Sequence, residues 1–136
     1  MSRQSPSGFD AGSFRDPSGR VLHHDGRVFR TVSDVGWRQF APVWQSGLLQ
    51  DLAAKGLVLP LRESQAAAAG NPDDAVRVFE TEKLPFVSWP FEWSFSALKA
   101  AALLHLDVHL AALDQGFTLS DASAWNIQFR GVQPVF

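Results

Sequence analysis

The chain has 136 residues, of which 46% are hydrophobic and 12% aromatic, and it carries a formal net charge of −2 at neutral pH. This composition excludes a disordered tail and predicts one domain with a substantial buried core. Twelve scattered Lys and Arg residues against fourteen acidic ones argue against a nucleic-acid surface, and the lack of cysteine excludes disulfides and thiolate metal sites.

Residues 1–19 are rich in Ser, Gly, Asp and Pro and show no hydrophobic periodicity. We expect them to form a flexible leader. They also lack the apolar core of a secretory signal peptide. Because the absence of cysteine suits a reducing compartment, we expect a cytoplasmic protein.

The segment 20–32, RVLHHDGRVFRTV, predicts a β-hairpin. Two runs rich in β-branched and aromatic residues flank Asp25-Gly26, the pair that a type I′ turn prefers. Ser33 then has the chemistry of a helix N-cap, and Asp34 would complement the positive end of the helix dipole.

The next segment has helical spacing. From Trp37 to Leu52 the apolar residues recur mostly at intervals of three and four positions, and Gly56 supplies a stop signal. Pro42 and Gly47 interrupt the pattern, so we expect two short helices.

Two strands separated by a linker are predicted between residues 57 and 84. The sequence LVLPL, residues 57–61, is typical of a short strand closed by Pro60. Residues 76–84, VRVFETEKL, alternate apolar and polar side chains as a strand does. The intervening segment 63–75 is a loop or linker, whose four alanines could hold a helical turn.

The segment 85–95, PFVSWPFEWSF, contains two prolines and five aromatic residues, which predicts a stiff, packed connection. Its aromatic side chains are candidates to line a ligand cleft, and the alternative is a core between two lobes. The residues concerned are Trp89, Phe91, Trp93 and Phe95. Glu92, the one charge in this run, would cap the following helix or pair with an arginine.

The segment 94–115 gives the strongest helix signal in the chain. Its apolar residues spread round most of the circumference, which predicts a largely buried helix that ends at Gly116. The apolar run from Ala97 to Leu113 is too polar for a membrane span. The residues that interrupt it are Lys99, His105, Asp107 and His109.

His105 and His109 stand at i and i+4 on one helix face, a spacing that can chelate zinc. Asp107 points roughly away from both, and no third ligand stands at a useful spacing, so we predict no metal site. His23 and His24 are weaker candidates, because adjacent strand residues face opposite sides.

A loop, a strand NIQF, a turn and a returning strand PVF complete the sequence. Since the sequence stops inside an apolar strand, we expect the natural protein to continue. The order of elements predicts an α+β fold: a small-lobe hairpin and helices, an aromatic connector, a long buried helix and a C-terminal β-hairpin. We expect a leader at 1–19, a small α+β lobe at 20–88, and the start of a helical second lobe at 89–136, cut before its end.

The loop SDASAWNIQF, residues 120–129, holds Asp121 and, five positions later, Asn126. Phosphotransferases of the protein-kinase type use Asp and Asn at this offset, the Asp to accept the substrate hydroxyl proton and the Asn to hold a metal ion on the nucleotide. Asp121 is therefore a candidate catalytic base and Asn126 a candidate metal–nucleotide ligand. The alternative is that both side chains cap an ordinary turn.

Other parts of a kinase site are missing. Leu119 and Ser120 stand where a His or Arg usually precedes the Asp, and residues 34–55 contain no Glu to pair with a strand lysine. None of the three lysines falls within a strand of the first hairpin. They are Lys55, Lys83 and Lys99.

Arg27 or Arg30 would have to replace that lysine. A Gly-rich phosphate loop is also missing, because Gly19 and Gly26 are isolated. We therefore do not expect an active kinase from these residues alone.

Four segments together resemble the N-terminal region of a family of bacterial class I SAM-dependent methyltransferases. They are HHDGRVFRTV, LPFVSWPFEWSF, ALLHLDVHLAAL and TLSDASAWNIQFRGVQPVF. In that family this region resembles a kinase-like fold and precedes the methyltransferase domain. The most specific parts are the motif at 92–95 and the motif at 121–129.

The resemblance implies that the family continues past PVF with an Ile-Asp pair. It implies S-adenosylmethionine as the cofactor of the full-length protein and a C-terminal methyltransferase domain of the same chain as the partner. A site for this cofactor needs a strand, a Gly-rich turn and a helix. The sequence contains no such unit, so we expect no cofactor within this segment.

Three functions follow from the sequence. The first is an accessory, substrate-positioning module of a SAM-dependent methyltransferase. The second is a kinase-like phosphotransferase fragment, with Asp121 as base and Asn126 as metal ligand. The third is a non-catalytic interaction module. We expect no nucleic-acid or membrane partner, and exposed apolar faces would favour self-association.

Overall fold

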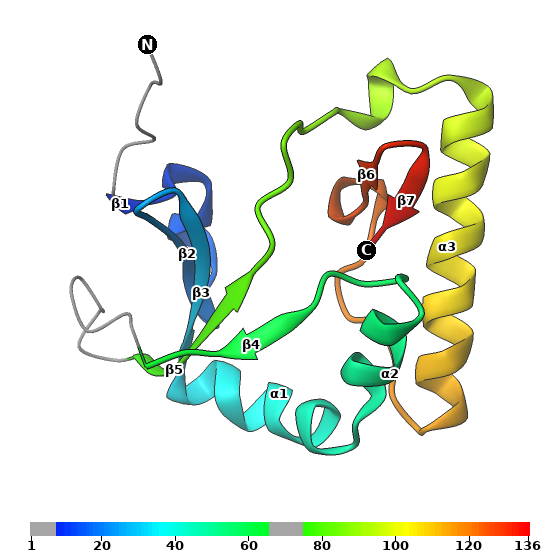
Figure 1. Ribbon diagram of the computed structural model, residues 1–136. Helices are drawn as coiled ribbons and strands as arrows, with labels where there is room; N and C mark the ends of the chain where they lie inside the picture. The colour runs from blue at the N-terminus through cyan, green and yellow to red at the C-terminus, as the bar shows by residue number, and fades with distance from the viewer. Residues whose placement is uncertain (1–7, 66–74) are drawn as a thin grey trace, which may run out of the picture. The chain divides into compact units, whose positions relative to one another are not determined.

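The computed structural model describes residues 8–65 and 75–136, which contain three α-helices and two antiparallel sheets (Figure 1). The predicted α+β class is confirmed. The contacts divide the chain into two units. The first runs up to Pro42 and resumes at Leu61–Lys83, and the second comprises Val43–Pro60 and Leu84–Phe136.

The first unit holds a five-stranded antiparallel sheet with the strand order β1-β2-β3-β5-β4. Its strands are β1 (Gly8–Phe9), β2 (Gly19–His24), β3 (Arg27–Ser33), β4 (Leu61–Glu63) and β5 (Ala75–Thr81). The hairpin is confirmed: Asp25 and Gly26 have φ of 48° and 75°, and a type I′ turn needs positive φ at both positions.

The prediction of a flexible leader at 1–19 is wrong for residues 8–19, which contain β1 and the 3₁₀ helix η1 (Ala11–Arg15). Side chains supply part of the hydrogen bonding of this segment, beside the backbone bonds of β1 and η1. Asp10 Oδ1 accepts from the backbone N–H of Gly12 at 2.8 Å, and Asp16 Oδ1 accepts from that of Ser18 at 2.8 Å. Such local capping leaves no hydrophobic period in the sequence. Residues 1–7, like residues 66–74 of the predicted linker, lie outside the described residues.

Two helices follow β3, as predicted. Helix α1 (Asp34–Gln45) begins after Ser33, whose Oγ accepts from the backbone N–H of Gly36 at 3.2 Å. Helix α2 (Leu48–Ala54) begins after Gly47, which has φ of 82° and breaks the run. Pro42 was expected to interrupt the run but lies inside α1. A proline removes only one backbone N–H donor, and helical turns form on both sides of it here.

Helix α1 packs against the sheet through aromatic rings. The ring centroids of Trp37 and Phe40 lie 6.3 and 5.7 Å from that of Phe79 on β5. The helix also approaches the backbone closely, because a Cβ built on Gly36 would lie 2.3 Å from the carbonyl oxygen of Ser18. A glycine is therefore required at this contact.

The second unit contains α2, the 3₁₀ helices η3 (Pro90–Glu92) and η4 (Ala124–Asn126), α3 (Phe95–Asp114), and a hairpin of β6 (Gln128–Arg130) and β7 (Gln133–Val135). Its core unites α2, α3 and the segment before β6. The buried members are Leu48, Leu52, Val58, Ala101, Leu104, Val108, Ala112 and Ile127. Because α2 packs here, the division differs from the predicted one at 20–88 and 89–136.

The prediction of a strand at 57–61 is wrong, because residues 57–60 are irregular and β4 begins at Leu61. The segment still pairs with the end of the chain through two backbone hydrogen bonds. Leu59 N donates to Phe136 O at 3.1 Å, and Phe136 N donates to Leu57 O at 2.9 Å. Pro60 has no N–H to extend the ladder.

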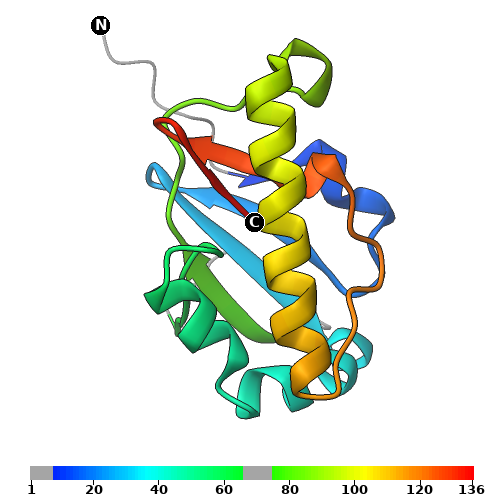
Figure 2. The same ribbon diagram turned by 90° about the vertical axis from the view of Figure 1, so that its right-hand side faces the viewer.

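The prediction of a largely buried helix at 94–115 is wrong in part. Helix α3 ends at Gly116 as expected, but only one of its faces is buried, against α2 and the β6–β7 hairpin (Figure 2). The leucines of the opposite face remain about half exposed. They are Leu103, Leu106, Leu110 and Leu113. By length and composition alone, α3 is the one described helix that could cross a membrane, although its inner face belongs to the core.

Candidate functional site

The loop between α3 and β6 is closed by its own side chains. Asn126 Oδ1 accepts from the backbone N–H of Ser123 at 2.9 Å and lies 3.4 Å from Ser123 Oγ. Ser123 Oγ in turn accepts from the backbone N–H of Trp125 at 3.3 Å. This reciprocal arrangement is a capping box around η4. The turn-capping interpretation therefore describes Asn126 in this structure.

Asp121 is exposed, and within the part of the chain that the structure describes its carboxylate makes no hydrogen bond or ion pair. No hydrogen bond joins it to Asn126 in that part either. Residues 8–65 and 75–136 contain no cluster of three metal-ligating side chains. To bind a metal ion on a nucleotide, the Asn126 oxygen would have to leave the backbone N–H of Ser123.

An apolar groove of about 400 Å³ lies beside this loop, between α3 and the residues that lead to β6. Helix α3 contributes Leu98, Ala102 and Leu106, and the loop contributes Ser123 and Ala124. The volume falls within the range of small-molecule pockets, which are mostly apolar and hold a few polar groups. Here those groups are Ser123 and His105.

The histidines of α3 are engaged by neighbouring groups. The His105 ring centroid lies 6.4 Å from that of His109 and 5.8 Å from that of Phe136. His109 Nε2 lies 3.3 Å from Thr118 Oγ1. Asp107 is exposed. The pair therefore packs and bonds within its own unit.

The hairpin histidines pair with separate carboxylates. His23 Nε2 lies 3.2 Å from Asp10 Oδ2, and His24 Nε2 lies 3.4 Å from Asp25 Oδ2. The backbone N–H of Gly12, together with the bond to His23, lowers the pKa of Asp10. The two histidines do not converge on one ligand.

The aromatic connector, residues 85–95, is hydrogen-bonded to β6 within the second unit. Ser88 N donates to Gln128 Oε1 at 2.9 Å, and Gln128 Nε2 donates to Ser88 O at 2.9 Å. Trp93 Nε1 donates to Ser88 Oγ at 2.8 Å, and its ring lies edge-on to Phe129 with centroids 5.1 Å apart. Of the predicted aromatic residues, Trp93 therefore belongs to the packed interior of this unit.

The other aromatic side chains of the connector are exposed, and two of them contact a residue that the sequence did not single out. The Trp125 ring centroid lies 5.6 Å from that of Trp89 and 6.2 Å from that of Phe91. Phe95 is 80% exposed. Trp125 directly precedes Asn126 in the loop.

The expectation that Glu92 caps the long helix is wrong, because this side chain caps η3. Its Oε2 accepts from the backbone N–H of Trp89 at 2.8 Å and so caps η3. The cap of α3 is Ser94, whose Oγ accepts from the backbone N–H of Ala97 at 3.3 Å. Serine is the more effective N-cap, because its short side chain reaches the free N–H groups.

The two arginines considered as substitutes for a kinase lysine have other partners. Arg27 Nε donates to Glu80 Oε1 on the neighbouring strand β5 at 2.7 Å, and Arg30 pairs with Asp16. The bond from Arg27 lowers the pKa of Glu80. Both arginines therefore bind carboxylates of strands and turns rather than a helix glutamate.

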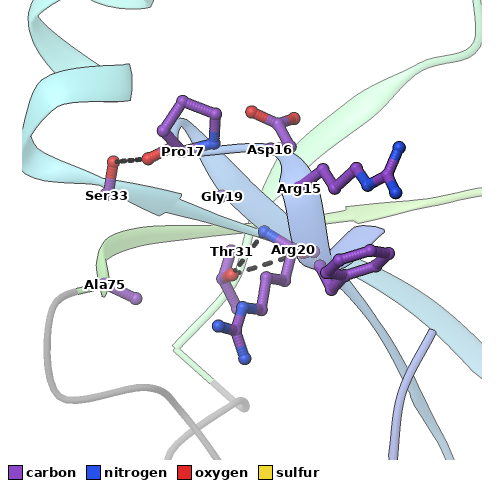
Figure 3. Close-up of a pocket in the computed structure, with 9 residues that line it drawn as sticks. Arg15, Asp16, Pro17, Gly19, Arg20, Thr31, Ser33 and Ala75 are labelled. Atoms are coloured by element: carbon purple, nitrogen blue, oxygen red, sulfur yellow. Dashed lines mark hydrogen bonds between the residues drawn. The ribbon is translucent and has the colours of Figure 1, made fainter. Parts of the chain in front are cut away.

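A second hollow, of about 260 Å³, lies in the first unit beside η1 and the ends of β2 and β3 (Figure 3). Its hydroxyl groups are already bonded. Thr31 Oγ1 accepts from Arg20 N at 3.0 Å, and Ser33 Oγ donates to Pro17 O at 2.9 Å. Figure 3 shows that the side chains of Arg15 and Arg20 extend in different directions, so their charges do not converge on one ligand.

Comparison with known proteins gives one informative relative. The chain is 40% identical over 127 residues to the nodulation protein NoeA of Rhizobium meliloti (strain 1021). The match covers 93% of this chain and 26% of that protein, so the chain spans about a quarter of the length of its curated relative. No family model matches the chain. No solved structure matches it either.

Proposed function

We propose that this chain is a non-catalytic, substrate-positioning module of a SAM-dependent methyltransferase. The methyltransferase part of the proposal rests on the resemblance carried by the motifs at 92–95 and 121–129. The length of NoeA is consistent with it, since the matched region is about a quarter of that protein and leaves room for a separate catalytic domain. The positioning role rests on the groove between α3 and the loop.

We also propose a kinase-like arrangement of the elements. Its support is an antiparallel sheet with helices inserted between β3 and β4, followed by a connector, a long helix, a loop with Asp121 and Asn126, and a short hairpin. In this proposal the loop is inherited as architecture and has lost its phosphate chemistry.

The observation that carries the non-catalytic role is the position of the Asn126 oxygen. A metal ion on a nucleotide would need that oxygen as a ligand. Here it accepts from the backbone N–H of Ser123, so metal binding would first have to break this hydrogen bond.

The first experiment measures magnesium–ATP binding by isothermal titration calorimetry in the wild-type chain and in Asn126→Ala and Asp121→Ala. We expect no binding in any of the three. Binding by the wild type that is lost in Asn126→Ala would identify a phosphotransferase site and overturn the proposal.

The second experiment tests the positioning role in a polypeptide that contains this segment together with a methyltransferase domain. Ala124→Phe would place a ring in the groove from the loop side. We expect a higher KM for the methyl acceptor and an unchanged KM for S-adenosylmethionine. Val132→Phe, at a 91% exposed position of the β6–β7 turn, is the matched control. Equal kinetics for both variants would exclude the groove as the acceptor site.

A further inference from the structure

Helix α3 has apolar side chains on two opposite faces. Ala101, Leu104, Val108 and Ala112 form the buried face. Leu103, Leu106, Leu110 and Leu113 form the opposite face, here named the leucine stripe, and are 52%, 55%, 59% and 51% exposed. A helix that serves only one core needs a single apolar face, so the leucine stripe calls for a second partner.

The spacing of the leucine stripe indicates what kind of partner fits. Its members are separated by three, four and three positions, which is the a and d pattern of a heptad repeat. Leucine at these positions packs against the same pattern on a second helix. The stripe extends over about 15 Å of helix.

We propose that the leucine stripe pairs with the leucine stripe of a second copy of this chain, with the two α3 helices antiparallel about a two-fold axis. In this arrangement Leu103 lies opposite the partner subunit's Leu113, and Leu106 lies opposite the partner subunit's Leu110. Every leucine of the stripe then meets a leucine, which is the self-complementarity that a two-fold interface requires.

The charges beside the stripe select the antiparallel orientation. Lys99 precedes the stripe and Asp114 follows it directly, and neither forms an ion pair among the described residues. An antiparallel pair brings Lys99 towards the partner subunit's Asp114 at both ends. A parallel pair would place equal charges together and align the two helix dipoles unfavourably.

One charge opposes the pairing. Asp107 lies beside the centre of the stripe and is exposed. The two-fold axis would bring it near the partner subunit's Asp107, and like charges at close range repel each other. Because the stripe is only about 15 Å long, we expect a weak dimer that dissociates on dilution.

The test is sedimentation equilibrium of the 136-residue chain over a wide concentration range. We expect a monomer–dimer equilibrium for the wild type. Leu103→Asp combined with Leu110→Asp should raise the dimer Kd at least about 100-fold. Both sites are more than half exposed, so circular dichroism should show unchanged helix content. Unlike Leu106, which belongs to both surfaces, neither lines the groove. Val132→Asp, on the β6–β7 turn, is the control and should leave Kd unchanged.

Charge variants test the orientation. Lys99→Asp should raise Kd about fivefold, and adding Asp114→Lys should restore it, because the pair is re-formed with reversed signs. Asp107→Asn should lower Kd. A monomeric wild type at every concentration would overturn the proposal and assign the stripe to another domain or to a lipid surface. A dimer unaffected by the leucine variants would overturn it as well. A double charge variant that is not restored would exclude the antiparallel orientation.

Discussion

Asn126 and Ser123 hold the loop through a closed set of hydrogen bonds rather than through packing, since both are exposed. Asn126→Ala removes the acceptor for the backbone N–H of Ser123. We expect the free energy of unfolding to fall by about 0.5–2 kcal/mol, the usual cost of a lost cap. Urea denaturation followed by circular dichroism measures it. Asp121→Ala is the matched control and should change stability by no more than about 0.5 kcal/mol; an equal loss in both variants would refute the capping role.

Asp16 links stability to pH. Burial tends to raise its pKa, but the backbone N–H of Ser18 and the guanidinium of Arg30 outweigh burial and lower it. A carboxyl whose pKa is lower in the folded state stabilises the fold above its unfolded pKa of about 3.9, and this contribution is lost as the pH falls through the lower folded value.

We therefore expect Asp16→Asn to lower the melting temperature at pH 7 and to reduce the loss of stability below about pH 4. Thermal melts between pH 7 and pH 2 measure both effects. Asp121→Asn, a carboxyl without a described partner, is the control. Parallel pH curves for the wild type and Asp16→Asn would show that Asp16 contributes nothing to acid sensitivity.

The sequence located the loop but could not decide between its two interpretations. An Asp and an Asn five positions apart are compatible with metal binding and with a turn cap, and only the direction of the Asn126 oxygen separates them. The contact of Trp125 with Trp89 also joins residues that are far apart in the sequence. No local pattern predicts such a contact.

Helix α1 requires a glycine where helices usually disfavour one. Replacing a glycine in a helix interior by alanine normally stabilises by about 0.5–1 kcal/mol. A Cβ at Gly36 would lie 2.3 Å from the carbonyl oxygen of Ser18, so the helix would have to move. We expect Gly36→Ala to destabilise by about 1–3 kcal/mol, measured by urea denaturation.

Gln39→Ala is the control for Gly36→Ala, because Gln39 is an exposed residue of the same helix. It should change stability by no more than about 0.5 kcal/mol. A stabilising effect of Gly36→Ala would contradict the close approach of α1 to Ser18.

Elements with local signals were predictable from the sequence. The Asp25-Gly26 turn and the stop at Gly116 act through positive φ angles, and the Ser33 cap acts through its side-chain oxygen. All three are local effects. The exposure of the leucine stripe was not predictable, because apolar residues all round a helix indicate that partners are needed without indicating which of them this chain supplies. The prediction of a strand at 57–61 failed for a related reason. Two backbone hydrogen bonds of residues 57–60 go to Phe136, which lies far along the sequence.

Neither unit of the molecule is a continuous stretch of sequence. Leu52 on α2 precedes β4 in the chain, yet its side chain is buried in the core of the second unit with residues of α3. We expect Leu52→Ala to destabilise by about 2–5 kcal/mol. Hydrogen exchange should lose protection mainly in α3 and at Ile127, because local opening follows packed units.

Leu22→Ala provides the matched comparison. Leu22 belongs to the separate cluster with Phe29 and Val78 in the sheet. Its truncation should reduce protection mainly in β2, β3 and β5. If both variants lose protection equally over all described elements, the two units do not open separately.

The α+β class was predictable for the whole molecule, because strand and helix patterns differ in period and each is local. The division into two units was not predictable from the sequence. A boundary at residue 88 follows from composition, whereas the observed division depends on where α2 packs, and its short apolar pattern is compatible with either neighbour.

The contact between Trp89 and Trp125 also gives the molecule an optical signature. Two indole rings with centroids 5.6 Å apart and planes inclined by 55° couple electronically when they absorb light. Such coupling produces a paired positive and negative band in far-ultraviolet circular dichroism. One ring belongs to the connector and the other to the loop, so the intensity of this couplet would report in real time, without an added label, whether the loop remains docked.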